Sequence, residues 1–324
     1  KTSSIFFKKI AACTTSIGRE RIYDASKGVI EWADKNGYHR PEVVYGDTDS
    51  VFVKFSRVHH ETNIKLEGKE ALQYCIDCGV KSGEWITKHK MNPDWNSEID
   101  GKGPQDLEYE KTFHPFILIS KKRYTGDKYE LKSDKPKERT SMGIVMKRRD
   151  NAPIVKYVFG NVIEIIMNQK SVDLAIEWLH NTLKLIQNGT MDRSMFTISK
   201  SLRGYYKNPQ GIAHKVLADR MAERNPGDKP KPNDRIPYVY IKLPDDQLYD
   251  YQNKYKSGVN KGKPRLKKIL QGDRIEHPDF IQENNLNIDY SFYISNQIMN
   301  PVKQVLDLEK EESITQQLFN EFIE

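Results

Sequence analysis

The chain has 324 residues, of which 37% are hydrophobic and 30% charged, and its formal net charge at neutral pH is +7. A mean hydropathy of −0.74 and the lack of a long apolar run exclude a transmembrane helix, so we expect no membrane partner. The three cysteines, Cys13, Cys75 and Cys78, are too few for a disulfide framework and are typical of an intracellular, reducing compartment.

The first part of the chain predicts a helix followed by a hairpin. Apolar side chains recur at near-helical spacing over residues 6–36, and Asn36 with Gly37 forms a typical helix end. Residues 43–45 and 51–53 are short apolar strands, and the turn between them has the sequence Gly-Asp-Thr-Asp-Ser. The chain starts at Lys1 within the apolar-periodic stretch, and we therefore expect that a preceding portion has been left out.

The next elements are predicted to be a helix over residues 63–91 and a strand over residues 107–119. The helix contains a single Cys-x-x-Cys motif, Cys75 to Cys78. Because a zinc site needs about four ligands and no second pair of Cys or His follows, we interpret these residues as two thiols on one side of a helix. In the strand, a period of two places Glu108 and Glu110 on one face.

From about residue 152 onward the pattern is mainly helical. Helices are predicted over 154–169, 172–188 and 211–224, with one isolated strand over 238–243 and a last helical region over 289–308. The change from strand-rich to helical sequence predicts a domain boundary near Thr140, with domains at 1–140 and 141–324.

Charge is distributed unevenly along the chain. Residues 121–156 contain 12 Lys or Arg against 5 Asp or Glu, and residues 254–274 contain 8 against 1. The last segment, residues 275–324, is acidic. Two concentrated basic segments favour a polyanionic partner, although solvated surfaces also carry such runs. Lysines and glycines dominate residues 254–268, which we expect to form a mobile surface loop.

The turn between the first two strands carries the strongest candidate for chemistry. Asp47 and Asp49 lie at its tip, and carboxylates on a rigid turn can hold divalent ions for phosphoryl transfer. Hard oxygen ligands suit Mg²⁺. Because Asp and Gly are also ordinary turn residues, the Asp-x-Asp pair alone leaves a purely structural role open.

The flanking residues identify a resemblance. Tyr-Gly-Asp-Thr-Asp-Ser, residues 45–50, resembles the C motif of family B DNA polymerases, in which the second aspartate is the main metal ligand. The resemblance implies that Asp49 is this ligand and that Asp47 supports it. Residues 107–111, Leu-Glu-Tyr-Glu-Lys, resemble the acidic palm strand of the family, which implies a further carboxylate near the metals at Glu110.

The resemblance continues in order along most of the chain and is nearest to the delta class and the large-DNA-virus enzymes. Residues 121–126 resemble the Lys-Lys-Arg-Tyr segment that follows the primer–template duplex, and residues 148–151, 234–239 and 289–290 resemble landmarks of the thumb. It implies the following DNA-binding residues: Lys121, Lys122, Arg123, Tyr124, Arg148 and Arg149. Cations at a strand end can contact phosphates with little sequence preference.

The resemblance implies an α+β fold, with an antiparallel palm sheet packed by helices and then a mostly helical thumb with a basic insertion near 254–274. The activity implied is DNA-directed DNA synthesis in replication, in the nucleus or at a cytoplasmic viral replication site. The partners would be primer–template DNA and dNTP, and Mg²⁺ would occupy a two-metal site completed by an aspartate outside this chain. The family's A motif and fingers motif are not found, so we expect this piece alone to be inactive.

Two other functions remain as alternatives. A non-catalytic duplex-binding module would use the aspartates only as turn residues, and an Asp-x-Asp glycosyltransferase would use them for a metal–sugar-nucleotide complex. Near the end of the chain, Gln316, Phe319 and Phe322 are similar to the peptides with which some polymerases bind a sliding clamp. Helical core spacing explains these three residues equally well.

Overall fold

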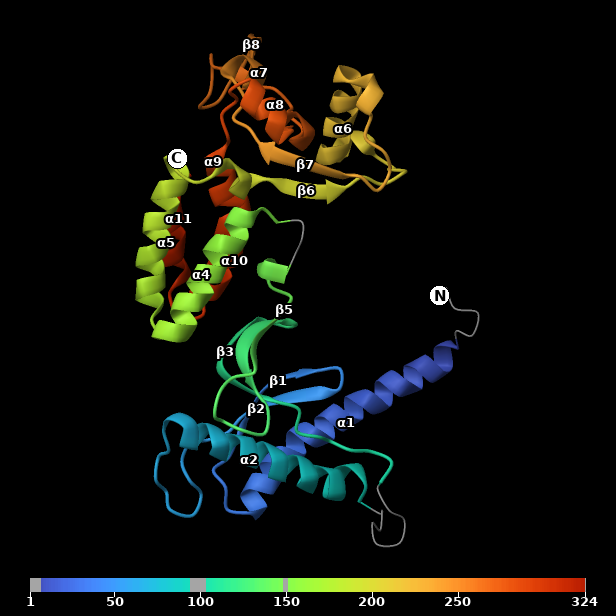
Figure 1. Ribbon diagram of the computed structural model, residues 1–324, viewed down its shortest axis with the longest axis vertical. Helices are drawn as coiled ribbons and strands as arrows, with labels where there is room; N and C mark the ends of the chain where they lie inside the picture. The colour runs from blue at the N-terminus through green and yellow to red at the C-terminus, as the bar shows by residue number, and fades with distance from the viewer. Residues whose placement is uncertain (1–6, 94–102, 148–150, 324) are drawn as a thin grey trace. The chain divides into compact units, whose positions relative to one another are not determined.

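The computed structural model describes residues 7–93, 103–147 and 151–323, and the chain divides into two compact units, Lys1–Ile144 and Val145–Glu324 (Figure 1). Both units combine helices with small antiparallel sheets, which confirms the predicted mixed fold class. Within the residues that the structure describes, no helix is both long and apolar enough to cross a membrane.

In the first unit, two helices pack beside a hairpin. Its first elements are α1 (Lys8–Lys35), β1 (Glu42–Asp47), β2 (Ser50–Lys54), α2 (Gly68–Ile86) and a π-helical turn, η1 (Thr87–Met91). Ala25 and Val29 of α1 pack against Ile86 of α2, and side chains of the hairpin such as Val51 cover this core. The N-terminal half of α1 is largely exposed, because its apolar residues meet no other described element.

The rest of the first unit is a three-stranded antiparallel sheet in the order β3-β4-β5. Its strands are β3 (Thr112–Ser120), β4 (Arg123–Tyr129) and β5 (Glu138–Met142). An aromatic cluster joins this sheet to the hairpin, since Phe52 of β2 stacks on Phe113 and Phe116 of β3 with ring centroids 6.2 and 5.7 Å apart. Tyr124 of β4 meets Phe52 edge-on at 5.4 Å.

The second unit contains a helical bundle built on apolar faces. Its helices are α4 (Pro153–Gln169), α5 (Val172–Gln187), α9 (Tyr290–Phe292), η7 (Tyr293–Ile298), α10 (Met299–Leu306) and α11 (Glu312–Asn320). Ser171 caps α5 by accepting a hydrogen bond from the Leu174 amide, and Gly189 ends it with a φ of 67° that glycine adopts without strain. Phe159, Leu179 and Phe319 are fully buried.

The second unit also contains a three-stranded sheet in the order β10-β7-β6. It consists of β6 (Ile198–Ser201), β7 (Arg235–Tyr240) and β10 (Ile275–Glu276), with α6 (Ala213–Arg224) and α8 (Pro278–Glu283) beside it. Tyr293 ties the bundle to this sheet, because its buried hydroxyl donates to the Phe196 carbonyl at 2.6 Å and accepts from the Tyr240 amide at 3.0 Å.

Several predicted elements differ from the structure. The second helix begins at Gly68 rather than near Asn63, because Val58 and Lys65 pair in a β-bridge before it. The strand expected from Leu107 begins only at Thr112. The strand predicted to be isolated is β7, which has partners on both sides.

The basic segment expected as a mobile loop instead contains two paired strands, β8 (Tyr249–Lys254) and β9 (Pro264–Leu266). The prediction was wrong for Lys254 and residues 264–266, because the many glycines and lysines hid the pairing. Residues 256–263 between the strands are exposed, and their mobility stays a prediction. Cys75 and Cys78 do lie on α2, as predicted for two thiols on a helix. Burial raises the pKa of both thiols, to about 12 for Cys78.

Candidate metal and nucleic-acid site

The candidate site is built on the tight turn between β1 and β2. Asp47 pairs with Ser50 at the end of the ladder, so Thr48 and Asp49 form the tip. Thr48 has a φ of 54°, an unusual conformation for a β-branched residue, and the Asp49 amide donates to the Asp47 carbonyl at 2.6 Å. Strained backbone of this kind concentrates at functional sites, which makes the tip a candidate for one.

The carboxylate of Asp47 is held by several neighbours. It accepts hydrogen bonds from the Tyr45 hydroxyl at 3.2 Å and the Thr48 hydroxyl at 3.0 Å. The Lys122 ammonium forms an ion pair with Asp47 Oδ1 at 2.8 Å. This contact is the main reason that the pKa of Asp47 is lowered, and it likewise raises the pKa of Lys122. Asp47 is therefore ionised and already partnered.

Asp49 has different surroundings. Its side chain is exposed, and it makes no hydrogen bond or ion pair with any other residue that the structure describes. A free carboxylate at the tip of a rigid turn can accept a metal ion without first giving up a partner. The structure thus distinguishes two aspartates that occupy similar places in the sequence.

The acidic segment over residues 107–111 lies along α2, in a groove that two glycines open. A Cβ on Gly79 would be 2.8 Å from the ring of Tyr109, and one on Gly83 would be 2.8 Å from the Leu107 carbonyl oxygen. The Leu107 amide donates to the Thr87 hydroxyl at 2.8 Å. These contacts fix the segment although it forms no strand ladder.

Glu110 faces away from this anchored side. Exposure alternates along the segment, with Leu107 and Tyr109 half-buried and Glu108 and Glu110 exposed, as the period of two predicts. Glu110 forms an ion pair with the neighbouring Lys111. The segment therefore directs its carboxylates outward.

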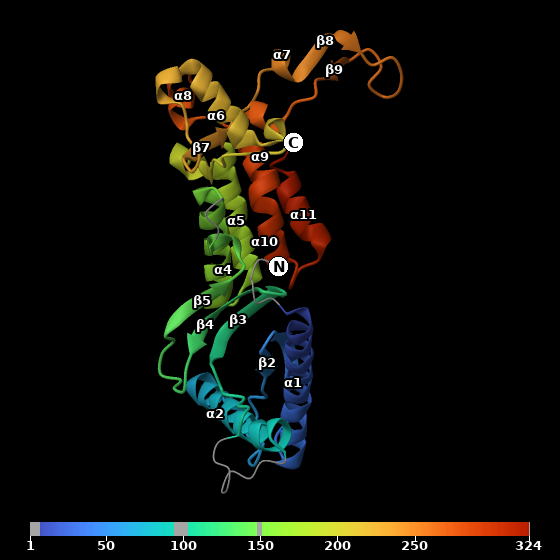
Figure 2. The same cartoon turned by 90° about the vertical axis from the view of Figure 1, so that its right-hand side faces the viewer.

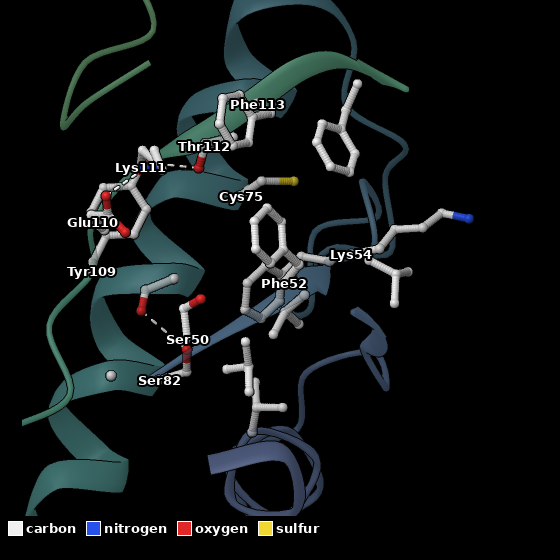
Figure 3. A pocket seen from close by; sticks show the side chains of 18 of the residues that line it. Ser50, Phe52, Lys54, Cys75, Ser82, Tyr109, Glu110, Lys111, Thr112 and Phe113 are labelled. Atoms are coloured by element: carbon white, nitrogen blue, oxygen red, sulfur yellow. Dashed lines mark hydrogen bonds and ion pairs between the residues drawn. The ribbon is translucent and has the colours of Figure 1, made fainter. Parts of the chain in front are cut away.

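Asp49 and Glu110 line the same pocket, which has a volume of about 780 Å³ and lies between α2, the hairpin and β3. Figure 3 shows Glu110 and Lys111 at one side of this pocket and Phe52 within it. Among the described residues, no three His, Cys, Asp or Glu side chains come close enough together to hold a metal ion. Asp49 and Glu110 thus share a pocket, and Asp47 lies on the same turn as Asp49, but the three carboxylates do not form a ligand set.

The basic residues at 121–123 form the tight turn between β3 and β4. Ser120 pairs with Arg123, so Lys121 and Lys122 are the two turn residues, and Lys122 has a φ of 59°. Both lysines are exposed. Gly143 supports this turn, since a Cβ there would be only 2.1 Å from the Lys122 carbonyl oxygen. The arrangement presents two cations beside the aspartate turn.

Two features of this region concern the other predicted DNA contacts. Tyr124 is 6% exposed, and its ring belongs to the aromatic cluster around Phe52, so its contact with DNA stays a prediction. Arg148 and Arg149 lie outside the described residues.

Sequence reasoning missed the residue that joins the two turns. The Tyr45 hydroxyl donates to Asp47 and accepts from the Lys122 amide at 2.9 Å, so one side chain bridges the aspartate turn and the lysine turn. The contact spans 77 positions, and no local pattern predicts it. The glycines at 79, 83 and 143 were missed for the same reason.

Comparisons with known proteins agree with the resemblance in the sequence. Residues 1–75 and 86–308 match the model of a family described as DNA polymerase family B. A DNA polymerase of Pyramimonas orientalis virus is 44% identical over 308 residues, which cover 95% of this chain and 22% of that protein. The DNA polymerase delta catalytic subunit of Candida albicans is 32% identical over 299 residues, or 91% of this chain and 24% of that protein.

A solved structure shows the same fold. The family B DNA polymerase of the archaeon Pyrobaculum calidifontis matches with a TM-score of 0.56 and 20% identity, over 94% of this chain and 31% of that one. The chain thus spans less than a third of that polymerase and less than a quarter of the two curated relatives.

Proposed function

The chain belongs to DNA polymerase family B, and from that premise we propose that it supplies part of the catalytic and DNA-holding apparatus of a DNA-directed DNA polymerase. In the proposed reaction, the 3′-hydroxyl oxygen of a primer bonds to the α-phosphorus of a dNTP, and pyrophosphate leaves. We assign residues 1–140 to the palm and 141–324 to the thumb. The observation that carries the proposal is the pair of turns in which a free Asp49 lies beside a partnered Asp47.

The residues of the turn fit a divalent metal. Asp49 would be the main ligand because its carboxylate is exposed and has no partner among the described residues. Asp47 would have only a supporting role, because a metal ion that binds its carboxylate has to compete with the Lys122 ammonium. Glu110 lines the same pocket and is the candidate for a further carboxylate. When bound, Mg²⁺ would stabilise the charge that develops on the reacting oxygens. An aspartate outside this chain would complete the site.

Lys121, Lys122 and Arg123 are proposed to hold the primer–template duplex close to that metal. Lys121 and Lys122 are exposed on a tight turn, where cations can contact phosphates and so bind DNA with little sequence preference. Arg148, Arg149 and Tyr124 are proposed to contact the duplex as well. The partners would be primer–template DNA and dNTP, in a nucleus or at a viral replication site.

A sliding clamp is a further proposed partner, although the three residues that suggested it have contacts within the fold. Phe319 and Phe322 are buried, and Gln316 accepts a hydrogen bond from Lys303 at 2.7 Å. These contacts favour a core role for the three residues.

The test of the metal assignment is primer extension by a polymerase that carries this chain. Asp49→Ala is expected to reduce Mg²⁺-dependent extension at least about 100-fold, because a ligand of the reacting centre is removed, and to leave duplex affinity nearly unchanged. Asp134→Ala, at an exposed carboxylate on the β4–β5 loop, is the matched control. Extension by the Asp49 variant near the wild-type rate would contradict the assignment.

A second test addresses the lysine turn. Replacing Lys121, Lys122 and Arg123 together with glutamine is expected to weaken duplex binding about equally for all sequences. The logarithm of the binding constant should also fall less steeply with the logarithm of the salt concentration. The slope should be smaller by about 0.9 for each phosphate that the variant no longer neutralises. Binding is measured by fluorescence anisotropy at several salt concentrations, and unchanged curves would mean that this turn does not contact DNA.

Because the chain belongs to DNA polymerase family B, the glycosyltransferase alternative no longer applies. A non-catalytic DNA-binding module remains the competing hypothesis. The Asp49→Ala test separates it from the proposed function, because a module that binds no metal does not need Asp49 as a ligand.

A further inference from the structure

The hairpin formed by β8 and β9 is an unsupported ribbon. Figure 2 shows it projecting from the rest of the second unit. No residue from 244 to 271 is buried, and Val259 at the tip is fully exposed. At its base the Lys267 amide donates to the Leu248 carbonyl at 2.9 Å. A two-stranded hairpin without a covering layer is only marginally stable in water, so a partner that covers it would stabilise it.

The tip nevertheless has a defined shape. The Tyr255 amide donates to the Lys263 carbonyl, and the Gly262 amide donates to the Tyr255 carbonyl, both at 3.0 Å. Gly258 and Gly262 have φ values of 80° and 85°, which glycine adopts without a steric penalty. The ribbon is therefore a preformed element, in contrast to a charged linker.

Its charge is predominantly positive, and no ion pair among the described residues offsets it. Residues 249–268 contain seven Lys or Arg and one acidic residue, Asp250. None of these cations forms an ion pair with a carboxylate in the described part of the chain. Lys267 donates a hydrogen bond only to the Asp246 carbonyl. Concentrated, unpaired cations repel one another, and a polyanion relieves that repulsion.

The cations occupy both faces of the ribbon. Lys254 pairs with Pro264 and so lies on the same face of the ribbon as Pro264. Arg265 follows Pro264 in β9 and lies on the opposite face, and its guanidinium is 5.5 Å from the ring centre of Tyr255. A ribbon that rests flat on a surface would need cations on one face only, whereas one that enters a groove meets phosphates on two sides.

We propose that the β8–β9 ribbon is a DNA-binding element in its own right, which enters a groove of the duplex and holds phosphates of both strands. This inference rests on the proposed function, because DNA is its polyanion. Strands about 4.8 Å apart fit the major groove of B-DNA, which is about 12 Å wide. An acidic protein is less favoured, because lysines dominate the ribbon and lysine is depleted in protein–protein interfaces.

Binding of the β8–β9 ribbon to DNA is expected to slow the dissociation of the polymerase from DNA without changing the chemical step. Phosphate contacts position a protein on DNA and add affinity that does not depend on sequence. The ribbon is therefore expected to lengthen the product made in one binding event by a polymerase that carries this chain.

The test compares two variants from which the same charge has been removed. In the ribbon variant glutamine replaces Lys254, Lys256, Lys261, Lys263 and Arg265. In the control variant glutamine replaces exposed lysines elsewhere, Lys65, Lys69, Lys88, Lys170 and Lys184. Every substituted side chain is exposed, so folding should be preserved, and equal thermal midpoints verify this. The probes are a 20-base-pair duplex and a poly-glutamate peptide of matched charge.

At about 0.15 M salt the ribbon variant is expected to bind the duplex at least about tenfold more weakly than the control variant. Its salt slope should be lower by about 0.9 for each phosphate that the ribbon no longer neutralises. Equal binding by the two variants would overturn the proposal, and so would tighter binding of poly-glutamate than of DNA.

The outcome can be separated from that of the proposed function. If Asp49→Ala abolishes extension while the ribbon variant binds like the control, the ribbon proposal fails and the polymerase assignment stands. If the ribbon variant no longer binds the duplex while Asp49→Ala extends normally, the ribbon binds DNA and the metal assignment fails.

Discussion

Asp47 and Asp49 show how far single residues can be interpreted from a sequence. The six residues from Tyr45 to Ser50 predicted the turn and its two carboxylates, and the resemblance ranked Asp49 first. The sequence could not give the physical reason, because it lies in the contact of Asp47 with Lys122, 75 positions away. The Tyr45 hydroxyl reinforces this contact from β1.

The ion pair between Asp47 and Lys122 makes a prediction about pH. Because the pKa of Asp47 is lowered in the folded protein, the pair adds stability above the ordinary pKa of an aspartate and loses it as pH falls through the folded value. Lys122→Met should return the pKa of Asp47 towards its ordinary value, whereas Lys132→Met should leave it unchanged. Carboxyl NMR titration measures the pKa of Asp47 in both variants. An unchanged Asp47 titration in Lys122→Met would show that the ion pair is absent in solution.

At the scale of elements, local pattern predicted α1, the β1–β2 hairpin, α4 and α5 closely, because each has a clear apolar period and a recognisable end. It failed where long-range packing decides. Residues 107–111 have strand-like alternation but lie along α2, in the space that Gly79 and Gly83 leave open. The β8–β9 pairing was missed because the ribbon buries no side chain and so leaves no apolar period.

The groove on α2 yields a prediction about two glycines. Gly83→Ala should destabilise the protein by about 1–3 kcal/mol, since its Cβ would lie 2.8 Å from the rigid Leu107 carbonyl. Gly18→Ala in α1 should stabilise it by about 0.5–1 kcal/mol, because nothing lies within 4 Å and alanine favours a helix. Urea unfolding measures both changes. Equal effects at the two positions would mean that the acidic segment does not occupy the groove.

At the scale of the whole molecule, the uneven charge of the sequence favours a polyanionic partner, although solvated surfaces also carry such runs. One basic segment includes the lysine turn beside Asp47, and the other forms the β8–β9 ribbon. Composition located both segments, but only the fold shows that one accompanies a metal-ligand candidate and that the other stands apart from any core. The metal site as a whole could not be predicted from this chain, because its described residues bring together too few ligands.

A change of ligand type at Asp49 tests whether this residue binds the metal used in nucleotide addition. Asp49→Cys, in a polymerase that carries this chain, replaces a hard oxygen ligand with a softer thiolate. Primer extension by this variant is expected to be abolished with Mg²⁺ and partly restored when Mn²⁺ or Cd²⁺ replaces it, while Asp134→Cys should extend normally with Mg²⁺. Undiminished Mg²⁺-dependent extension by Asp49→Cys would show that Asp49 is not a ligand of that metal.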